Sequence, residues 1–308
     1  MTFGTAASRR TVAITGAAGF LGRHLSAVLR ARGLTVIGIV RPGARTGDVD
    51  GRIDHDLADV ASLAAALRDA GVEVVCHLAW DGHPRSAGMA YSAQLDRNVV
   101  PSANLALASG LAGVTHVLFV SSGGAVAVPR KGPRPAYGWA KVAVEAILEA
   151  TSRDFGYALT VLRPTALMGP NQDPSRGLGA VTIFARQALL HEPVRIIGSP
   201  AASRDFLHVL DLSECIAAVV DRRAAGVFEV GGPELIRLDV LVAMLEQALE
   251  EKVAVEIVPG NGMDPDVVRM DNTAITAAVG WSPRRTLAAS LPDILREADV
   301  GSRTGRSE

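Results

Sequence analysis

The sequence predicts an α/β protein: a doubly wound parallel sheet with a smaller carboxyl-terminal α/β lobe. Short β-branched runs alternate with helical patterns along most of the chain, as is typical of right-handed βαβ units. A glycine-rich turn, TGAAGFLG, follows the first of these runs and precedes the first helical pattern. A chain of 308 residues with 48% hydrophobic residues can bury one large core, or a main core with a smaller lobe.

The elements follow in order. Thr11–Thr15 is the first predicted strand, and a helix follows it through Ala31. Gly33 stands where a left-handed residue ends a helix, and Leu34–Val40 forms the second strand. Further strands are expected at Arg52–Asp54, Glu73–Leu78, Val114–Val120, Ala158–Leu162 and Val227–Val230. Further helices are expected at Val60–Ala70, Ala93–Ala112, Tyr137–Arg153 and Leu210–Arg222.

After Pro164 this regular alternation breaks. The run MGPNQDPSRGLG is rich in turn residues and predicts a crossing to a second lobe. That lobe is expected to contain helices at Ala180–Leu190 and Asp239–Glu251 and strands at Val194–Ile197 and Val253–Val258. We expect a first domain at 10–165 plus about 204–230, a second lobe at about 166–203 plus 231–300, and flexible tails at 1–9 and 301–308.

Composition excludes several functions. A formal net charge of -1 leaves no basic field for nucleic acid and no polybasic patch for a membrane. The two cysteines, Cys76 and Cys215, lie in apolar patterns and are interpreted as buried thiols rather than a disulfide framework. The first residues lack the apolar core of a signal peptide, and no apolar stretch is long enough to cross a bilayer. We therefore expect a soluble cytoplasmic protein.

The glycine-rich turn is the first candidate binding site. Gly16, Gly19 and Gly22 let the backbone approach a pyrophosphate, and the helix that begins near Phe20 and Leu21 offers N–H donors and a positive dipole. The sequence therefore predicts a Rossmann-type domain that binds a dinucleotide. Because the spacing is GxxGxxG rather than GxGxxG, a tight packing turn without a ligand remains the alternative.

The end of the second strand bears on the choice of cofactor. A carboxylate there would bind the ribose 2′-hydroxyl of NAD, whereas an arginine accommodates the 2′-phosphate of NADP. Val40 occupies the acidic position and Arg41 follows it, so NADP(H) is favoured over NAD(H); the alternative is that Arg41 is a solvated surface residue. Asp56 and Leu57, after the third strand, are candidates for the adenine edge. Leu78 and Ala79, at the end of the fourth strand, are candidates for the cofactor cleft.

Tyr137 and Lys141 are the strongest catalytic candidates. Their spacing in YGWAK puts both side chains on one face of a helix, one turn apart. An ammonium group beside a phenol is expected to lower the pKa of the tyrosine toward neutrality, where it can exchange a proton. The serine pair Ser121–Ser122 ends the strand that precedes this helix. A phosphate cradle, a hydroxyl and a Tyr/Lys pair in this order predict a nicotinamide-dependent enzyme.

These motifs resemble the extended short-chain dehydrogenase/reductases, in the NAD-dependent epimerase/dehydratase branch that includes UDP-glucose 4-epimerase. The resemblance runs nearly the whole chain, through TGAAGFLG, CHLA, RNVVPSANL with Asn98, FVSSGGAV, YGWAK, LRPTALMGP, RDFLHVLDL and GWSP. It implies a Rossmann domain with a substrate lobe, and a homodimer formed through the helices near 93–112 and 137–153. Among the residues of LRPTALMGP, Pro164 is assigned to the cofactor site.

The resemblance also implies roles for single residues. Tyr137 would be the acid/base at a sugar or ketone oxygen, and Lys141 would bind the nicotinamide ribose. Ser122 would hydrogen-bond the same oxygen as Tyr137. Arg204 would meet the diphosphate of a TDP- or UDP-linked sugar, with an ion pair to its neighbour Asp205 as the alternative.

Two further residues, Trp80 and His77, lie just after and within the fourth predicted strand. Trp80 follows this strand, where the substrate would lie, and either lines the pocket or packs the loop. His77 within the strand is interpreted as a core histidine. Other positions depart from the family pattern: Gly123 stands where many relatives have the catalytic serine or threonine, and Ala166 and Asn261 replace polar substrate contacts.

Four functions follow from these assignments. The first is NADPH-dependent reduction of a keto group on a nucleotide-diphosphate deoxysugar. The second is a 4-epimerase that holds NAD tightly. A dehydratase is less favoured because the acidic pair of such enzymes is replaced by Gly124 and Ala125. The last, a non-catalytic cofactor sensor of the same fold, is disfavoured by the intact Tyr137 and Lys141.

Overall fold

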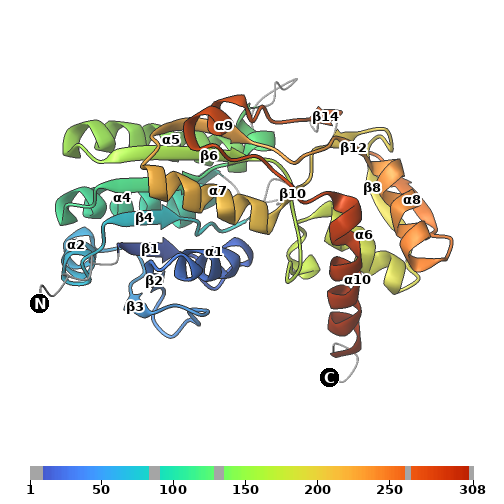
Figure 1. Ribbon diagram of the computed structural model, residues 1–308, viewed down its shortest axis with the longest axis horizontal. Coiled ribbons are helices and arrows are strands. Elements are labelled where there is room, and N and C mark those ends of the chain that lie inside the picture. Colours follow the sequence, from blue (N-terminus) through green and yellow to red (C-terminus); the bar gives the residue numbers. More distant parts are fainter. Residues whose placement is uncertain (1–9, 83–90, 128–134, 261–264, 305–308) are drawn as a thin grey trace, which may run out of the picture.

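A seven-stranded parallel sheet forms the centre of the protein (Figure 1). The computed structural model describes residues 10–82, 91–127, 135–260 and 265–304. The strand order is β11-β6-β5-β4-β1-β2-β3, so the chain moves outward from β1 in one direction and then, from β4, in the other. The strands are β1 (Thr11–Thr15), β2 (Thr35–Val40), β3 (Gly51–Asp54), β4 (Val74–His77), β5 (His116–Val120), β6 (Ala158–Pro164) and β11 (Gly226–Val230).

Helices cover both faces of this sheet, because its apolar strands must be buried on both sides. On one face α1 (Phe20–Ala31) packs against α7 (Val209–Arg222), and α7 contacts α9 (Thr273–Val279). On the other face α4 (Val100–Ala112) lies between α2 (Val60–Asp69) and α5 (Ala136–Phe155). The topological switch point, where parallel sheets of this kind bind ligands, therefore lies between β1 and β4.

A third apolar cluster lies beside the sheet and gathers residues from 168–206 and 236–295. Figure 1 shows its elements grouped at one end of the molecule. They are α6 (Ala180–Leu189), β8 (Val194–Ile197), α8 (Leu238–Leu249), β13 (Val255–Val258) and α10 (Leu287–Thr304). Short strands connect this lobe to the sheet: β7 (Leu167–Met168), β9 (Ser203–Arg204), β10 (Leu207–His208), β12 (Ile236–Arg237) and β14 (Val267–Val268).

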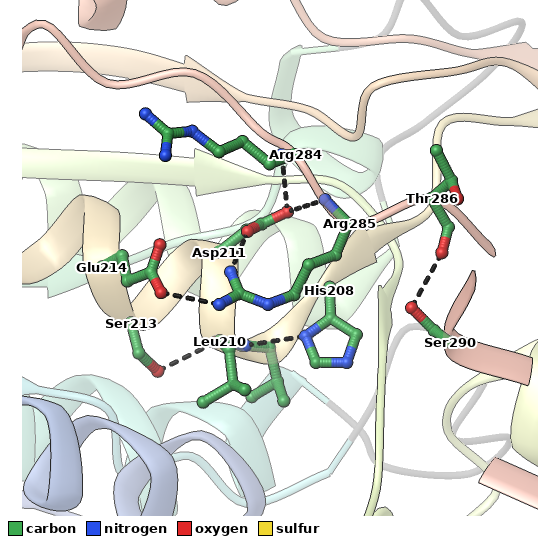
Figure 2. A network of polar contacts seen from close by, with 10 residues as sticks. His208, Leu210, Asp211, Ser213, Glu214, Arg284, Arg285, Thr286 and Ser290 are labelled. Atoms are coloured by element: carbon green, nitrogen blue, oxygen red, sulfur yellow. Dashed lines mark hydrogen bonds and ion pairs between the residues drawn. The ribbon is translucent and has the colours of Figure 1, made fainter. Parts of the chain in front are cut away.

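The segment that leads into α10 is anchored on α7 by a buried carboxylate (Figure 2). Asp211 is fully buried, and its Oδ2 accepts backbone N–H groups from Arg284 at 3.0 Å and Arg285 at 2.8 Å. The Arg285 guanidinium pairs with the same carboxylate and donates to Glu214 at 2.8 Å. These bonds compensate the charge buried at Asp211, and they attach the carboxyl-terminal chain to a helix of the sheet domain.

The central strands begin and end within about two residues of their predicted positions. The helix predicted at Ala93–Ala112 is different. It consists of α3 (Tyr91–Gln94), a π-helical turn η1 (Leu95–Val99) and α4. The side chain of Asn98, inside this turn, bonds both the N–H and the carbonyl of Asp81.

The predicted flexible tails fall largely outside the described residues. Residues 301–304 are the exception, because they form the last turn of α10. In the part of the chain that is described, no helix is both long and apolar enough to cross a membrane.

Candidate active site

The turn after β1 gathers backbone N–H groups at the amino end of α1. Gly16 has φ of 74°, which residues with a Cβ rarely adopt. A Cβ on Gly22 would lie 2.1 Å from the Gly16 carbonyl oxygen, so only glycine permits this approach. Among the described residues no side chain caps α1 at Gly19, and its first turn, which begins at Phe20 and Leu21, contains no acidic residue. The helix dipole is therefore available to an anion, and the turn fits a dinucleotide pyrophosphate.

The ends of β1 and β4 are tied together beside this turn. The Thr15 hydroxyl accepts the backbone N–H groups of Leu78 and Ala79, both at 3.1 Å. A Cβ on Gly16 would lie 3.0 Å from the Ala79 nitrogen, so the two chain segments are in close contact. The structure thus places Leu78 and Ala79 next to the glycine-rich turn, at the switch point of the sheet.

His77 supports this junction from inside the core. Its Nδ1 bonds the Thr15 hydroxyl at 2.7 Å, and its Nε2 bonds the Ser102 hydroxyl at 2.8 Å. Burial, with a smaller effect of Lys141, lowers the pKa of His77 to about 3. A neutral histidine with both ring nitrogens bonded has a structural role, as the sequence indicated.

At the end of β2 the side chain of Arg41 is exposed. In the described part of the chain it has no hydrogen bond or ion pair. The nearby carboxylates of Asp48 and Asp50 are both directed to Arg30, at 2.5 Å and 2.9 Å. The apolar Val40 thus stands where a carboxylate would bind the ribose 2′-hydroxyl. Asp48 and Asp50, the next acidic residues along the chain, are already paired with Arg30.

After β3 the two adenine-edge candidates differ. Leu57 is buried and has φ of 64°, while Asp56 is exposed and accepts the Ala58 N–H at 3.0 Å. Because β3 pairs with β2, both residues follow the strand next to the one that ends before Arg41. Their contact with a cofactor stays a prediction.

Three predicted catalytic residues lie together beyond the carboxyl ends of β4 and β5. Tyr137 and Lys141 come from one face of α5, and the side chain of Ser122 hydrogen-bonds Tyr137. The Lys141 Nζ donates to the Val120 carbonyl at 2.9 Å and lies 3.6 Å from the centroid of the Trp80 ring. The Trp80 ring also meets the Tyr137 ring edge to face, at 5.9 Å between centroids.

The expected lowering of the tyrosine pKa by Lys141 is wrong for this geometry. Burial raises the pKa of Tyr137 to about 12, and the hydrogen bond from Ser122 opposes this only in part. The Lys141 amine lies 5.9 Å from the Tyr137 ring centroid. Burial also lowers the pKa of Lys141 well below its ordinary value. In this site the removal of water therefore dominates the pKa of both groups.

The two serines of the turn after β5 have different partners. The Ser121 hydroxyl donates to the Glu145 carboxylate, and its backbone N–H donates to the Leu162 carbonyl at 2.7 Å. Ser122 is the serine whose side chain contacts Tyr137. The structure therefore brings Ser122, and not Ser121, to the phenol.

The space that a side chain at position 123 would need is occupied by another residue. A Cβ at this position would lie 2.2 Å from the Met270 sulfur and 2.9 Å from the Arg163 carbonyl oxygen. Met270 is buried, so its thioether fills the space that a serine or threonine at position 123 would need. Met270 thus leaves no room for a hydroxyl-bearing side chain at position 123, and the hydroxyl that bonds Tyr137 comes from Ser122 instead.

Trp80 is partly buried and packs against Phe119, with 6.0 Å between the ring centroids. Its indole Nε1 is buried, and no described residue accepts its hydrogen. The structure places Trp80 against Tyr137 and Lys141. Its contact with substrate stays a prediction.

Arg204 is the last residue of β9 and lines a cavity of about 210 Å³. Its Nη1 donates to the Ser203 carbonyl at 2.7 Å and the Asp266 carbonyl at 3.2 Å. Asp205 is directed elsewhere: it accepts the Thr165 hydroxyl at 2.5 Å and the backbone N–H of Met270 at 2.8 Å. Burial raises the pKa of Asp205 to about 6.

Several predicted positions remain without a tested role. Pro164 is buried as the last residue of β6, and its contact with the cofactor stays a prediction. Asn261 lies outside the described residues.

Sequence reasoning missed Glu145 and Met270. Glu145 could have been found, because it follows Lys141 by one helical turn on the same face, whereas Met270 has no local signal.

This sheet, with a glycine-rich turn at its switch point and a Ser/Tyr/Lys cluster beside it, defines a protein of the extended short-chain dehydrogenase/reductase class. The profile of the NAD dependent epimerase/dehydratase family matches residues 12–231, and the chain belongs to that family.

Individual relatives are similar to this protein along most of the chain. A UDP-glucose 4-epimerase of Mycolicibacterium smegmatis is 29% identical over 305 residues, covering 90% of this chain and 95% of the relative. A dTDP-4-dehydro-6-deoxy-D-allose reductase of Streptomyces bikiniensis is 25% identical, covering 89% of this chain and 92% of the relative. The crystal structure of the Thermus thermophilus UDP-glucose 4-epimerase in complex with NAD matches with a TM-score of 0.83 and 26% identity, covering 94% of this chain and 98% of the other.

Proposed function

We propose that the protein is an NADPH-dependent reductase of a keto group on a nucleotide-diphosphate deoxysugar. The observation that carries the proposal is the hydrogen-bonded Ser122–Tyr137 pair, with Lys141 on the same helix, beside the glycine-rich turn. The reductase from Streptomyces bikiniensis supports a keto sugar linked to dTDP as the substrate class.

In this reaction the bound nicotinamide cofactor supplies the hydride that reaches the carbonyl carbon. Tyr137 gives its phenolic proton to the carbonyl oxygen, and Ser122 holds that oxygen through a hydrogen bond. A pKa of about 12 keeps Tyr137 protonated at neutral pH and therefore able to donate. Lys141 would bind the nicotinamide ribose through a further N–H of its ammonium group while it keeps the Val120 carbonyl, and its charge would then stabilise the phenolate that forms.

The preference for NADPH rests on Arg41. Its guanidinium is exposed and without a partner in the described residues, while Asp48 and Asp50 are held by Arg30. A guanidinium at this strand end suits the 2′-phosphate of NADP, which NAD lacks.

An epimerase with tightly bound NAD is the second candidate. The relative from Mycolicibacterium smegmatis and the NAD complex of the Thermus enzyme favour it. The same Tyr137 would serve it, because an epimerase first removes a proton from a hydroxyl group and later returns one to the ketone.

Mass analysis of the cofactor released from the purified protein separates the two candidates. The reductase is expected to lose its cofactor on purification, to bind NADPH more tightly than NADH, and to lose part of that preference in Arg41→Ala. Retained NAD, or equal affinity of the unmutated protein for both cofactors, would instead support the epimerase.

We also propose that the protein is a homodimer formed through α4 and α5. These helices pack side by side and leave large apolar side chains exposed: Leu107, Leu111, Trp139 and Phe155. A second copy of the chain would cover this surface, as the family resemblance implies. Sedimentation equilibrium should give a dimer that Leu111→Glu converts to a monomer, and a monomeric unmutated protein at micromolar concentration would contradict the proposal.

A further inference from the structure

Glu145 lies one helical turn beyond Lys141, on the face of α5 that also carries Tyr137. Only 11% of its side chain is exposed. Its carboxylate accepts the Ser121 hydroxyl and pairs with the Arg163 guanidinium, with Oε2 and Nη2 at 2.5 Å. Burying a carboxylate costs free energy unless neighbouring groups pair with its charge and donate hydrogen bonds to it.

The first neighbour is the serine turn. The Ser121 hydroxyl bonds Glu145, and the Ser121 N–H bonds the Leu162 carbonyl of β6 at 2.7 Å. The preceding carbonyl, of Val120, accepts from Lys141 at 2.9 Å. These three bonds hold the turn between α5 and β6, and the next side chain along it, Ser122, bonds Tyr137.

The second neighbour is Lys141, which is 3% exposed and lies under the rings of Trp80 and Phe119. Burial lowers its pKa, and the negative charge of Glu145 acts in the opposite direction.

The other titratable groups around Lys141 do not supply a negative charge. His77 on β4 is neutral, with a pKa of about 3, and Tyr137 on α5 is neutral, with a pKa of about 12. Arg163 on β6 is a cation paired with Glu145. Within the described residues Glu145 is therefore the anion that favours the ammonium form of Lys141.

We propose that Glu145 is a positioning residue. Its carboxylate holds the Ser121–Ser122 turn so that Ser122 faces Tyr137, and it favours the charged form of Lys141 beneath the rings of Trp80 and Phe119. The proposal rests on the function proposed above for Tyr137 and Lys141. Glu145 acts through Ser121 and Lys141.

The lysine content of the chain makes a direct test practical. It has three lysines, Lys131, Lys141 and Lys252, so protein grown with [13Cε]lysine gives three NMR signals, and Lys141→Arg assigns the relevant one. Glu145→Gln and Arg163→Gln form a matched pair. Both remove the same ion pair, but only the first removes the negative charge that acts on Lys141.

Glu145→Gln should lower the NMR-measured pKa of Lys141 by about one unit, as expected for the loss of a nearby opposite charge. Arg163→Gln should not lower it. If Lys141 must be charged for turnover, the alkaline limb of the pH–rate profile should move to lower pH in Glu145→Gln by a similar amount. The double variant Glu145→Gln/Arg163→Gln leaves no unpaired buried guanidinium. If Glu145→Gln does not fold, the pKa of Lys141 in the double variant should instead be lower than in Arg163→Gln, because these two proteins differ only in the charge of residue 145.

An unchanged pKa of Lys141 in Glu145→Gln, or an equal fall in both single variants, would overturn the proposal and leave the ion pair with a structural role alone. The NMR titration needs neither substrate nor turnover. Failure of the proposed reaction would therefore appear as an inactive unmutated protein, separately from the pKa of Lys141.

Discussion

Adding one carbon atom at Gly123 should destabilise the protein, because Met270 already fills that space. In Gly123→Ala the new Cβ would lie 2.2 Å from the Met270 sulfur and 2.9 Å from the Arg163 carbonyl oxygen. Both distances are well below ordinary contact, and one of the two obstructing atoms belongs to the backbone. The side chain of Met270 would therefore have to move.

Overpacking of this kind typically costs about 1–3 kcal/mol. In a chain of this size that corresponds to a fall in Tm of roughly 1.5–4.5 °C, at about 1.5 °C for each kcal/mol. The adjacent glycine provides a matched control. A Cβ on Gly124 would meet only the Val268 Cγ1, at 3.7 Å, which is an ordinary contact, so Gly124→Ala should change Tm by much less.

Differential scanning calorimetry of the two alanine variants measures this difference, and Met270→Val tests its cause. Valine is shorter than methionine, so the double variant Gly123→Ala/Met270→Val should be more stable than the sum of the two single effects predicts. A Gly123→Ala variant as stable as Gly124→Ala, or purely additive effects, would refute the assignment of Met270 to this space.

Four further outcomes are expected. Tyr137→Phe should lower turnover about 10²-fold or more with cofactor affinity retained, because only the proton-transfer hydroxyl is lost; turnover within a few-fold of the unmutated protein would remove Tyr137 from the mechanism. Ser122→Ala should lower turnover with little change in cofactor affinity and without loss of Tm. Ser121→Ala should lower Tm because it removes one of the donors to the Glu145 carboxylate, which then keeps only Arg163. A near-silent Ser122→Ala beside a damaging loss of turnover in Ser121→Ala would reverse these roles. Arg204→Ala should weaken binding of TDP or UDP by roughly ten- to a hundred-fold in calorimetry at saturating NADPH, and failure of the unmutated protein to bind either nucleotide would favour a smaller ketone. Burial raises the pKa of Asp205 to about 6, so the folded state binds its proton more tightly than the unfolded state. The free energy of unfolding should therefore fall as pH rises from about 4 through 6. Urea unfolding should show a weaker fall in Asp205→Asn, and an identical pH dependence of the variant and the unmutated protein would contradict the assignment.

The sequence by itself determined the features that depend on neighbours along the chain. The order of the central strands and helices follows from local periodicity, and the glycine-rich turn from the backbone freedom of Gly16 and the close approach at Gly22. The shared helix face of Tyr137 and Lys141 follows from their spacing of four residues.

Only the tertiary structure decided the electrostatics of the site and the choice of hydroxyl. The pKa of Tyr137 depends on how completely the fold removes water from it, and burial raises this pKa where the neighbouring Lys141 was expected to lower it. Ser121 and Ser122 cannot be distinguished by spacing, because their roles depend on Glu145, which binds one of them, and on Met270, which arrives from more than a hundred residues away to fill the space at Gly123. Contacts between such distant residues leave no periodic pattern in the sequence, since they form only when α5, β6 and the segment after β14 pack around the same turn.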